Sequence, residues 1–295
     1  MVVVYPDRVN SALATESGFG SFGAEEGRAL AQEPLFAPIA DLLTSFAPGR
    51  FGDPARLDTL ACEVEPRPHA QPGHPIRFVS PDNTRLGYER RIHATGEVIT
   101  RPDNWHDLFN ALVWLRFPRA KAALNALHMA QMAIAQGAPG RGALRDAATQ
   151  FDESGLVVLA SDPVLLDLLH ARRWHELFWQ RRADVRACMR FLVFGHGLYD
   201  ALRAPFYRMC GRAAFILADA AVIASDVLTQ CRHADGVLAQ RFRAGTWYPR
   251  PKTLMALPLL GIPGVSAASE CAEYYLDTVQ FRPPPDVDLS PHLET

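Results

Sequence analysis

Apolar residues along the chain recur at helical spacing in several segments. Between residues 105 and 116 they fall every three or four positions, which predicts a helix that begins after the N-capping residues Asp103 and Asn104. Pro118 either ends this helix or opens the next one, which we expect at residues 119–136. Two helices joined by so tight a turn run antiparallel, so polar side chains on their facing sides can meet.

The remaining segments divide into further helices, short strands and a loop. Helical spacing recurs at residues 38–46, 163–173, 174–190, 198–202 and 213–230. Strand-like runs occur at 156–160 and at 88–92 and 97–100, the last two forming a predicted β-hairpin. Residues 190–194 suit either a strand or a helix. Residues 65–81 are rich in proline and predict an extended surface loop.

Together these elements predict an α+β fold. We expect a predominantly α-helical single domain at residues 31–283, with a small β-hairpin or sheet. Residues 1–30 are rich in Gly, Ser and Ala and are expected to be poorly ordered. Residues 284–295 begin within a run of three prolines and are expected to form an irregular tail.

Composition narrows the class of protein. The chain has 295 residues, of which 48% are hydrophobic and 21% charged, the balance of a folded protein. Its net charge of -2 argues against a nucleic-acid partner. Its five cysteines are scattered without a CxxC motif, as in a reducing compartment. No signal peptide precedes the chain's first predicted helix, and its apolar runs are shorter than the about 20 residues of a membrane span. We therefore expect a cytoplasmic protein.

Imidazole and amide side chains share faces of the two predicted central helices. His106 and Asn110 are four residues apart on the first, and Asn125 and His128 are three residues apart on the second. Imidazole nitrogen is a favoured ligand of zinc, nickel, iron and copper, and Asp107 would add a carboxylate. These five residues are candidate ligands of a divalent metal ion. In the alternative, they cap helices and bond the backbone inside the core.

A second cluster joins Arg145 to three acidic residues before the strand predicted at 156–160. Asp152 and Glu153 are adjacent, and paired carboxylates at the end of a rigid element can bind a metal or divide into general acid and base. Arg145 is a candidate for binding an anionic group of a substrate. In the alternative, this is a capping and turn sequence in which Arg145 pairs with one acid.

A third candidate is His196, which has a glycine on each side. These glycines leave its backbone free and its ring accessible. Asp200 lies one helical turn later, where a carboxylate would hold the imidazole in one tautomer, as a general base requires. The alternative is a structural histidine at the start of a helix.

Four segments contain most of these candidates: WHDLFNALVWLRFPRAKAALNALH at 105–128, RDAATQFDESG at 145–155, FGHGLYDAL at 194–202 and LPLLGIPG at 257–264. They resemble a proteobacterial family that is defined as a domain of unknown function. The resemblance covers residues 35–283. It implies a shared architecture and a shared site, but no assigned reaction.

Metal-dependent hydrolysis is the function that the candidates favour. One or two divalent ions would activate water against a small-molecule substrate or a phosphoester, held by His106, His128 and His196 with Asp107, Asp152 or Glu153. A carboxylate outside the metal shell would act as general base.

Two other functions remain open. One is a non-enzymatic binding or interaction module, in which the polar residues only tie helices together. The other is a nuclease similar to the His-metal finger enzymes, in which a hairpin precedes a base-activating histidine and a metal-binding asparagine. The predicted hairpin at 88–100, His106 and Asn125 follow that order.

Overall fold

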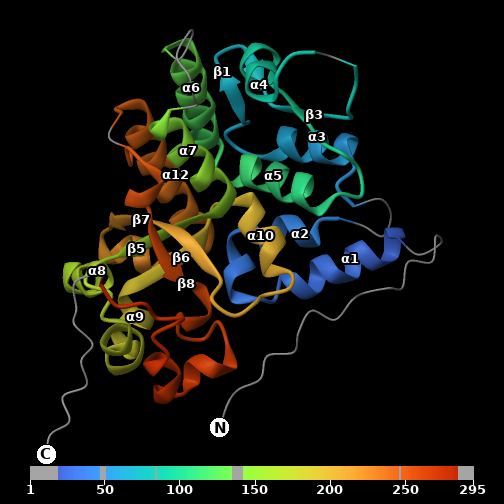
Figure 1. The fold of residues 1–295 in the computed structure, drawn as a ribbon. Coiled ribbons are helices and arrows are strands. Elements are labelled where there is room, and N and C mark those ends of the chain that lie inside the picture. Colours follow the sequence, from blue (N-terminus) through green and yellow to red (C-terminus); the bar gives the residue numbers. More distant parts are fainter. Residues whose placement is uncertain (1–18, 47–50, 84, 135–141, 246, 285–295) are drawn as a thin grey trace, which may run out of the picture.

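A four-stranded mixed sheet lies beneath the main group of helices (Figure 1). Its strand order is β6–β5–β7–β8, with β5 parallel to β7 and both outer strands antiparallel to their neighbours. The strands span Met189–Val193 (β6), Gly155–Ala160 (β5), Cys210–Leu217 (β7) and Met255–Pro258 (β8). Every residue of β5 is buried. A strand that is covered on both faces of its sheet has apolar residues at successive positions of the sequence. The prediction of a strand at 156–160 is confirmed.

The computed structural model describes residues 19–46, 51–83, 85–134, 142–245 and 247–284. The helices nearest the candidate site and its support are α5 (Trp105–Arg116), α6 (Pro118–Ile134), α7 (Ala143–Ser154) and α12 (Val227–Arg243). The other α-helices are α1 (Phe19–Leu30), α2 (Ala40–Thr44), α3 (Pro54–Glu63), α4 (Tyr88–Thr95), α8 (Pro163–His170), α9 (Arg182–Cys188), α10 (His196–Leu202) and α11 (Ala220–Ala224). The many helices and the small sheets confirm the prediction of a predominantly helical α+β fold.

Short tight helical segments complete the described chain. They are Pro34–Ile39, the π-helical turn Glu176–Gln180, Pro251–Thr253, Leu259–Gly261, Ala267–Glu270 and Ala272–Leu276. The helices predicted at 38–46, 163–173 and 174–190 therefore occur with shifted ends, and 190–194 is mostly strand. No helix among these described segments is both long and apolar enough to cross a membrane.

The central helix pair agrees with its sequence pattern. The Asn104 side chain caps α5 by accepting a hydrogen bond from the Asp107 amide at 3.0 Å. Helix α12 packs along α6 and holds its first turn, because the buried Asp235 carboxylate accepts hydrogen bonds from the Ala120 amide at 2.7 Å and the Arg119 amide at 3.3 Å. The end predicted for α6 at Gln136 lies outside the described residues.

The predicted β-hairpin at 88–100 is wrong. Residues 88–95 form helix α4, and Glu97–Ile99 (β4) pairs in parallel with Arg77–Val79 (β3). Gly96 has a φ of 74° and its amide bonds the Ile92 carbonyl at 2.8 Å, so it ends the helix where a hairpin turn was expected. A Cβ atom there would lie 2.2 Å from the Pro75 carbonyl oxygen. Glycine is thus required by both the helix end and the packing.

The helix predicted at 213–230 is also wrong over its first part. Residues 210–217 form β7, and helical structure begins only with α11 and α12. A strand buried in the middle of a sheet lacks the polar alternation of a half-exposed strand, so its apolar run has no periodicity to distinguish it from a buried helix. The apolar residues of β7 are followed closely by those of α11, so the sequence pattern of the whole segment predicted one long helix.

The two ends of the chain are described only in part. Residues 19–30, within the segment expected to be poorly ordered, form helix α1, which packs against α2. Residues 1–18 and 285–295 lie outside the described residues. The proline-rich segment at 65–81 is extended as predicted, but it is not a surface loop throughout: it contains the short antiparallel strands His69–Gln71 (β1) and His74–Pro75 (β2), followed by β3, and Ile76 and Phe78 are buried.

Candidate metal centre

Three side chains from three separate helices meet where α10 packs against both α5 and α7. His106 lies in the first turn of α5, Glu153 in the last turn of α7, and His196 is the first residue of α10. One nitrogen or oxygen atom from each lies within 4.8 Å of the others. Two imidazoles and a carboxylate at this spacing could hold a metal ion.

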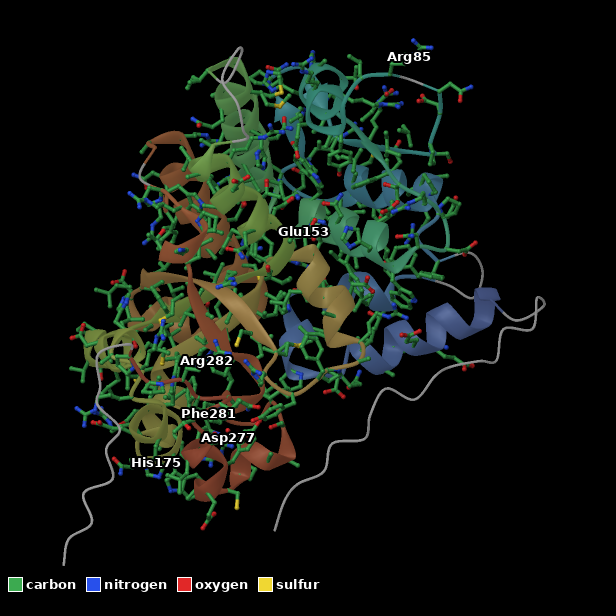
Figure 2. All side chains as sticks on the ribbon, in the orientation of Figure 1. Arg85, Glu153, His175, Asp277, Phe281 and Arg282 are labelled. Atoms are coloured by element: carbon green, nitrogen blue, oxygen red, sulfur yellow. The ribbon has the colours of Figure 1, made fainter. Side chains whose placement is uncertain are left out.

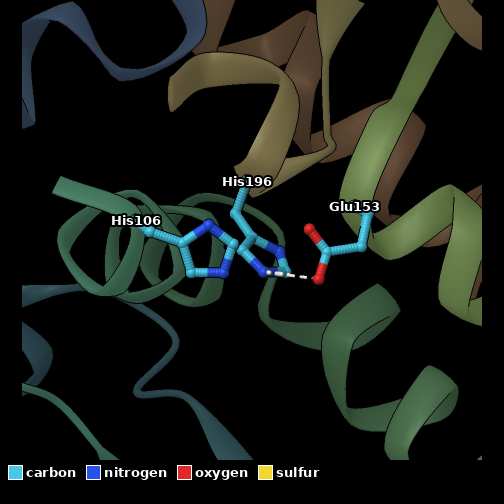
Figure 3. A group of neighbouring side chains, drawn as sticks. All are labelled: His106, Glu153 and His196. Atoms are coloured by element: carbon cyan, nitrogen blue, oxygen red, sulfur yellow. Dashed lines mark ion pairs between the residues drawn. The ribbon is translucent and has the colours of Figure 1, made fainter. Parts of the chain in front are cut away.

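The side chains point toward one another (Figure 3). His196 Nε2 lies 3.5 Å from Glu153 Oε1. The His106 and His196 ring centroids are 4.6 Å apart, with the rings at 69°. Hydrogen bonding to His196 lowers the pKa of Glu153, as do the charges of His196 and His106, so the carboxyl group is ionised at neutral pH. An ionised carboxylate is the form that binds a metal.

Glycine allows α7 and α10 to approach so closely. The Gly195 amide bonds the Gly155 carbonyl at 2.9 Å, and a Cβ on Gly195 would lie 2.6 Å from the Glu153 carbonyl oxygen. A Cβ on Gly197 would lie 2.4 Å from Glu153 Oε2. The glycines that flank His196 therefore make room for Glu153, which is a more specific role than the accessibility that the sequence suggested.

Asp152 precedes Glu153 on α7 and is largely shielded from solvent, with its side chain 15% exposed. One of its oxygens, Oδ1, lies 2.5 Å from Lys121 Nζ, and the other, Oδ2, lies 3.9 Å from Nδ1 of His196. Burial alone would raise the pKa of Asp152, but the Lys121 ammonium and the His196 imidazole outweigh it and hold the pKa below its usual value. Asp152 is therefore an ionised group between two nitrogen donors.

Lys121 continues this chain of contacts into the core. Its Nζ donates to Asn110 Oδ1 at 3.1 Å, and Asn110 Nδ2 donates to the Tyr88 hydroxyl at 2.6 Å. Nζ also lies 5.5 Å from the centroid of the Trp114 ring. Asn110, predicted as a metal ligand, is instead bound on both sides by protein groups. Lys121 and Tyr88 were not predicted as site residues.

A polar cavity of about 240 Å³ opens beside the His106, Glu153 and His196 side chains. Its lining combines residues of α4, β4, α5, α6, α7, α10 and the loop before α5, and it includes most of the predicted site residues: Tyr88, Glu89, Ile99, Arg101, His106, Asp107, Asn110, His128, Arg145, Thr149, Asp152, Glu153 and His196. His106, His128 and His196 thus face one space, as the hydrolase hypothesis required. Its volume lies below the roughly 300–1,000 Å³ of drug-sized ligand sites, so it suits a small ligand.

Two predicted ligands on α6 have different surroundings. Asn125 Nδ2 donates to the Glu89 side chain at 2.6 Å and to its carbonyl at 3.0 Å, so Asn125 ties α6 to α4. His128 is buried, and neither of its ring nitrogens hydrogen-bonds a described residue. Burial lowers the pKa of His128, so the ring is neutral at pH 7.

Two predicted acids are engaged elsewhere. Asp107 accepts hydrogen bonds from the Arg101 amide and guanidinium, all at 2.8 Å, so it holds the loop before α5. Asp200 pairs with Arg203 at 3.0 Å on α10. The expectation that Asp200 orients His196 is wrong, because the Asp200 carboxylate faces Arg203 instead. The carboxylates that approach the His196 imidazole are those of Asp152 and Glu153, from α7.

A family model described as "Protein of unknown function (DUF3025)" matches residues 76–284. The match contains α4 through β8 and every residue of the cavity lining. No curated protein and no solved structure matches the chain.

Proposed function

The chain belongs to the DUF3025 family of proteins of unknown function, and we propose that it is a metal-dependent hydrolase whose divalent ion is held by His106, Glu153 and His196. The observation that carries this proposal is the convergence of one ligand atom from each residue within 4.8 Å at the edge of a polar cavity. Two histidines and a glutamate are the ligand set of several catalytic zinc sites, in which a fourth position is left to water.

An unpartnered nitrogen supports the same assignment. His196 Nδ1 is buried without a hydrogen bond, and an unpartnered buried polar atom is costly. Ligating histidines commonly bind the metal through one nitrogen and donate the other N–H to a carboxylate. Asp152 Oδ2, at 3.9 Å from Nδ1, is placed to accept that N–H after a small shift, while Nε2 faces Glu153 and His106.

The chemistry follows from the ligand set and the surroundings. A bound divalent ion lowers the pKa of its water to about 7 and polarises the bond to be cleaved. Asp152 was a candidate general base, but both of its oxygens face nitrogen groups, Lys121 and His196. We assign Asp152 the role of a positioning residue, which keeps His196 in the tautomer that leaves Nε2 free.

The nuclease alternative is not retained. Its order of elements required a hairpin before His106, and residues 88–95 are helical. Its metal-binding asparagine, Asn125, is bound to Glu89. A binding module remains the alternative to the hydrolase, and it predicts that the three residues bind no metal.

Metal binding tests the proposal directly. Protein freed of metal with a chelator is titrated with Zn²⁺ and Mn²⁺ against a fluorescent indicator. Wild type is expected to bind one ion, and Glu153→Gln and His106→Ala to lose at least tenfold in affinity while unfolding cooperatively. The control is His175→Ala, because His175 lies near the lower edge of the molecule in Figure 2, well away from Glu153 at its centre. Equal affinity in all four proteins contradicts the site.

Catalysis is then tested on the metal-loaded protein. A screen with chromogenic phosphomonoesters, phosphodiesters and carboxylic esters is expected to find hydrolysis that Glu153→Gln abolishes and His175→Ala retains. If the protein binds metal but hydrolyses none of these substrates, the proposed metal site is supported and the proposed hydrolase activity is contradicted. Binding of neither metal nor substrate would favour the binding module.

A further inference from the structure

Hydrogen-bond donors line the cavity together with the three proposed ligands. Arg145 and Thr149 lie on one face of α7, eight and four residues before Glu153, and all three line the cavity. The Arg145 side chain makes no ion pair and no hydrogen bond to the described residues, and its Nε is buried without a partner. This contrasts with Arg91, which binds two carboxylates.

His128 and Tyr88 add two further donors to the same lining. Arg145 and His128 line the same cavity. The neutral His128 ring carries one N–H, for which the described residues supply no acceptor. The Tyr88 hydroxyl accepts from Asn110 and keeps its own hydrogen, because desolvation of the hydroxyl and the charges of Glu89, Asp152 and Asp107 raise its pKa well above the usual value.

The acidic residues of the cavity, in contrast, mostly have partners. Asp107 is paired with Arg101, Asp152 with Lys121, and Glu89 accepts from Asn125. Glu153 belongs to the proposed metal centre. The lining thus offers a guanidinium, an imidazole N–H and a phenol O–H that have no acceptor, beside a place for a divalent cation. This arrangement is complementary to a group with several negatively charged oxygens.

We propose that Arg145, His128 and Tyr88 form an oxyanion subsite that binds the phosphoryl or carboxylate group of a small substrate. This inference rests on the proposed function, because it assigns the substrate class of the same cavity. A guanidinium binds either group with two parallel hydrogen bonds, and the cavity volume of about 240 Å³ limits the substrate to a small molecule. The bond to be cleaved would lie between this subsite and His106, Glu153 and His196.

Calorimetric titration with inorganic phosphate, and separately with succinate, tests the subsite. Both titrations use chelator-treated protein and Zn²⁺-loaded protein at low ionic strength. Arg145→Gln is expected to weaken binding of the preferred anion at least about tenfold, because charged hydrogen bonds are lost. Tyr88→Phe is expected to weaken it severalfold. Arg145→Gln should retain the wild-type unfolding temperature, since its side chain has no protein partner to lose.

The matched control is Arg101→Gln. Arg101 lines the same cavity, but its guanidinium is bound to Asp107. Its removal is expected to change anion affinity less than threefold. Phosphate as the preferred anion supports a phosphoester substrate, and succinate a carboxylate substrate. Binding of neither anion, or equal loss in Arg101→Gln and Arg145→Gln, would overturn the subsite.

The same data separate this inference from the metal proposal. If no metal binds, anion binding to chelator-treated protein still depends on Arg145, provided the subsite exists. If the subsite is absent, Arg145→Gln behaves as wild type in both preparations while Zn²⁺ affinity still depends on His106 and Glu153.

Discussion

Lys121 Nζ lies 2.5 Å from Asp152 Oδ1 beside the proposed metal centre, where the Lys121 side chain is buried and the Asp152 side chain is only 15% exposed. Lys121→Met would leave an ionised carboxylate in the core without its cation. We expect a loss of about 3–5 kcal/mol in the free energy of unfolding, the usual cost of removing one partner of a buried pair. Urea denaturation followed by circular dichroism measures it.

The double variant Lys121→Met/Asp152→Asn controls for lost packing. It removes both charges, so it is expected to recover part of the stability that Lys121→Met loses. A double variant whose loss is the sum of the two single losses would show that the pair is not energetically coupled.

Gly197→Ala tests the close approach of α10 to Glu153. The new Cβ would lie 2.4 Å from Glu153 Oε2 and 3.1 Å from its carbonyl oxygen. Because the carboxylate is the end of a flexible side chain, it is expected to move, so Zn²⁺ affinity should fall at least tenfold. The free energy of unfolding should change by only about 1 kcal/mol.

Gly236→Ala is the matched control for this substitution. Gly236 lies within α12 with no atom within 4 Å of the position of a Cβ. Alanine there is expected to stabilise the helix by about 0.5–1 kcal/mol and to leave Zn²⁺ affinity unchanged. Full Zn²⁺ affinity in Gly197→Ala would contradict the proposed role of Glu153.

Asp200→Asn separates the two possible partners of His196. Asp200 pairs with Arg203, and a partly exposed pair of this kind contributes about 0–1 kcal/mol. The substitution is expected to change Zn²⁺ affinity less than threefold, whereas Asp152→Asn should weaken it tenfold or more. If Asp200→Asn lowered Zn²⁺ affinity strongly and Asp152→Asn did not, Asp200 would instead be the residue that orients the His196 imidazole.

Asp235, which does not line the cavity, predicts a pH dependence of stability. Burial raises its pKa from 3.8 to about 6, despite hydrogen bonds from the Ala120 and Arg119 amides. The native state therefore holds a proton that the unfolded state releases between pH 4 and 6, so Asp235 favours folding at low pH. Its contribution is lost as the pH rises through about 6, by about 3 kcal/mol in total.

Asp235→Asn, which does not titrate, provides the comparison. The stability of the variant relative to wild type should increase between pH 4 and 7, as measured by urea denaturation at each pH. A constant difference across this range would show that the Asp235 pKa is not raised.

Local patterns in the sequence predicted helices α5 and the start of α6, because each carries its own period, cap and stop signals. They failed at residues 88–95 and 210–217, where Gly96 ends a helix instead of turning a hairpin and where a buried strand has no alternation. Both errors arise because a short segment takes its structure from the surfaces that it packs against.

The site was predicted in separate parts. His106, Glu153 and His196 were each singled out, but their convergence depends on how α5, α7 and α10 pack, which spacing within one helix does not reveal. Lys121 was missed, although it shares a face of α6 with Asn125 and His128 at positions i, i+4 and i+7. A lysine on an otherwise buried polar face was the available signal.

The most direct test of the metal centre is a crystal structure of Zn²⁺-loaded protein with anomalous diffraction recorded at the zinc absorption edge. We predict one strong anomalous peak about 2.0–2.2 Å from a nitrogen of His106, from Nε2 of His196 and from an oxygen of Glu153. Zinc bound only at other histidines, or no peak among these three side chains, would contradict the proposed function.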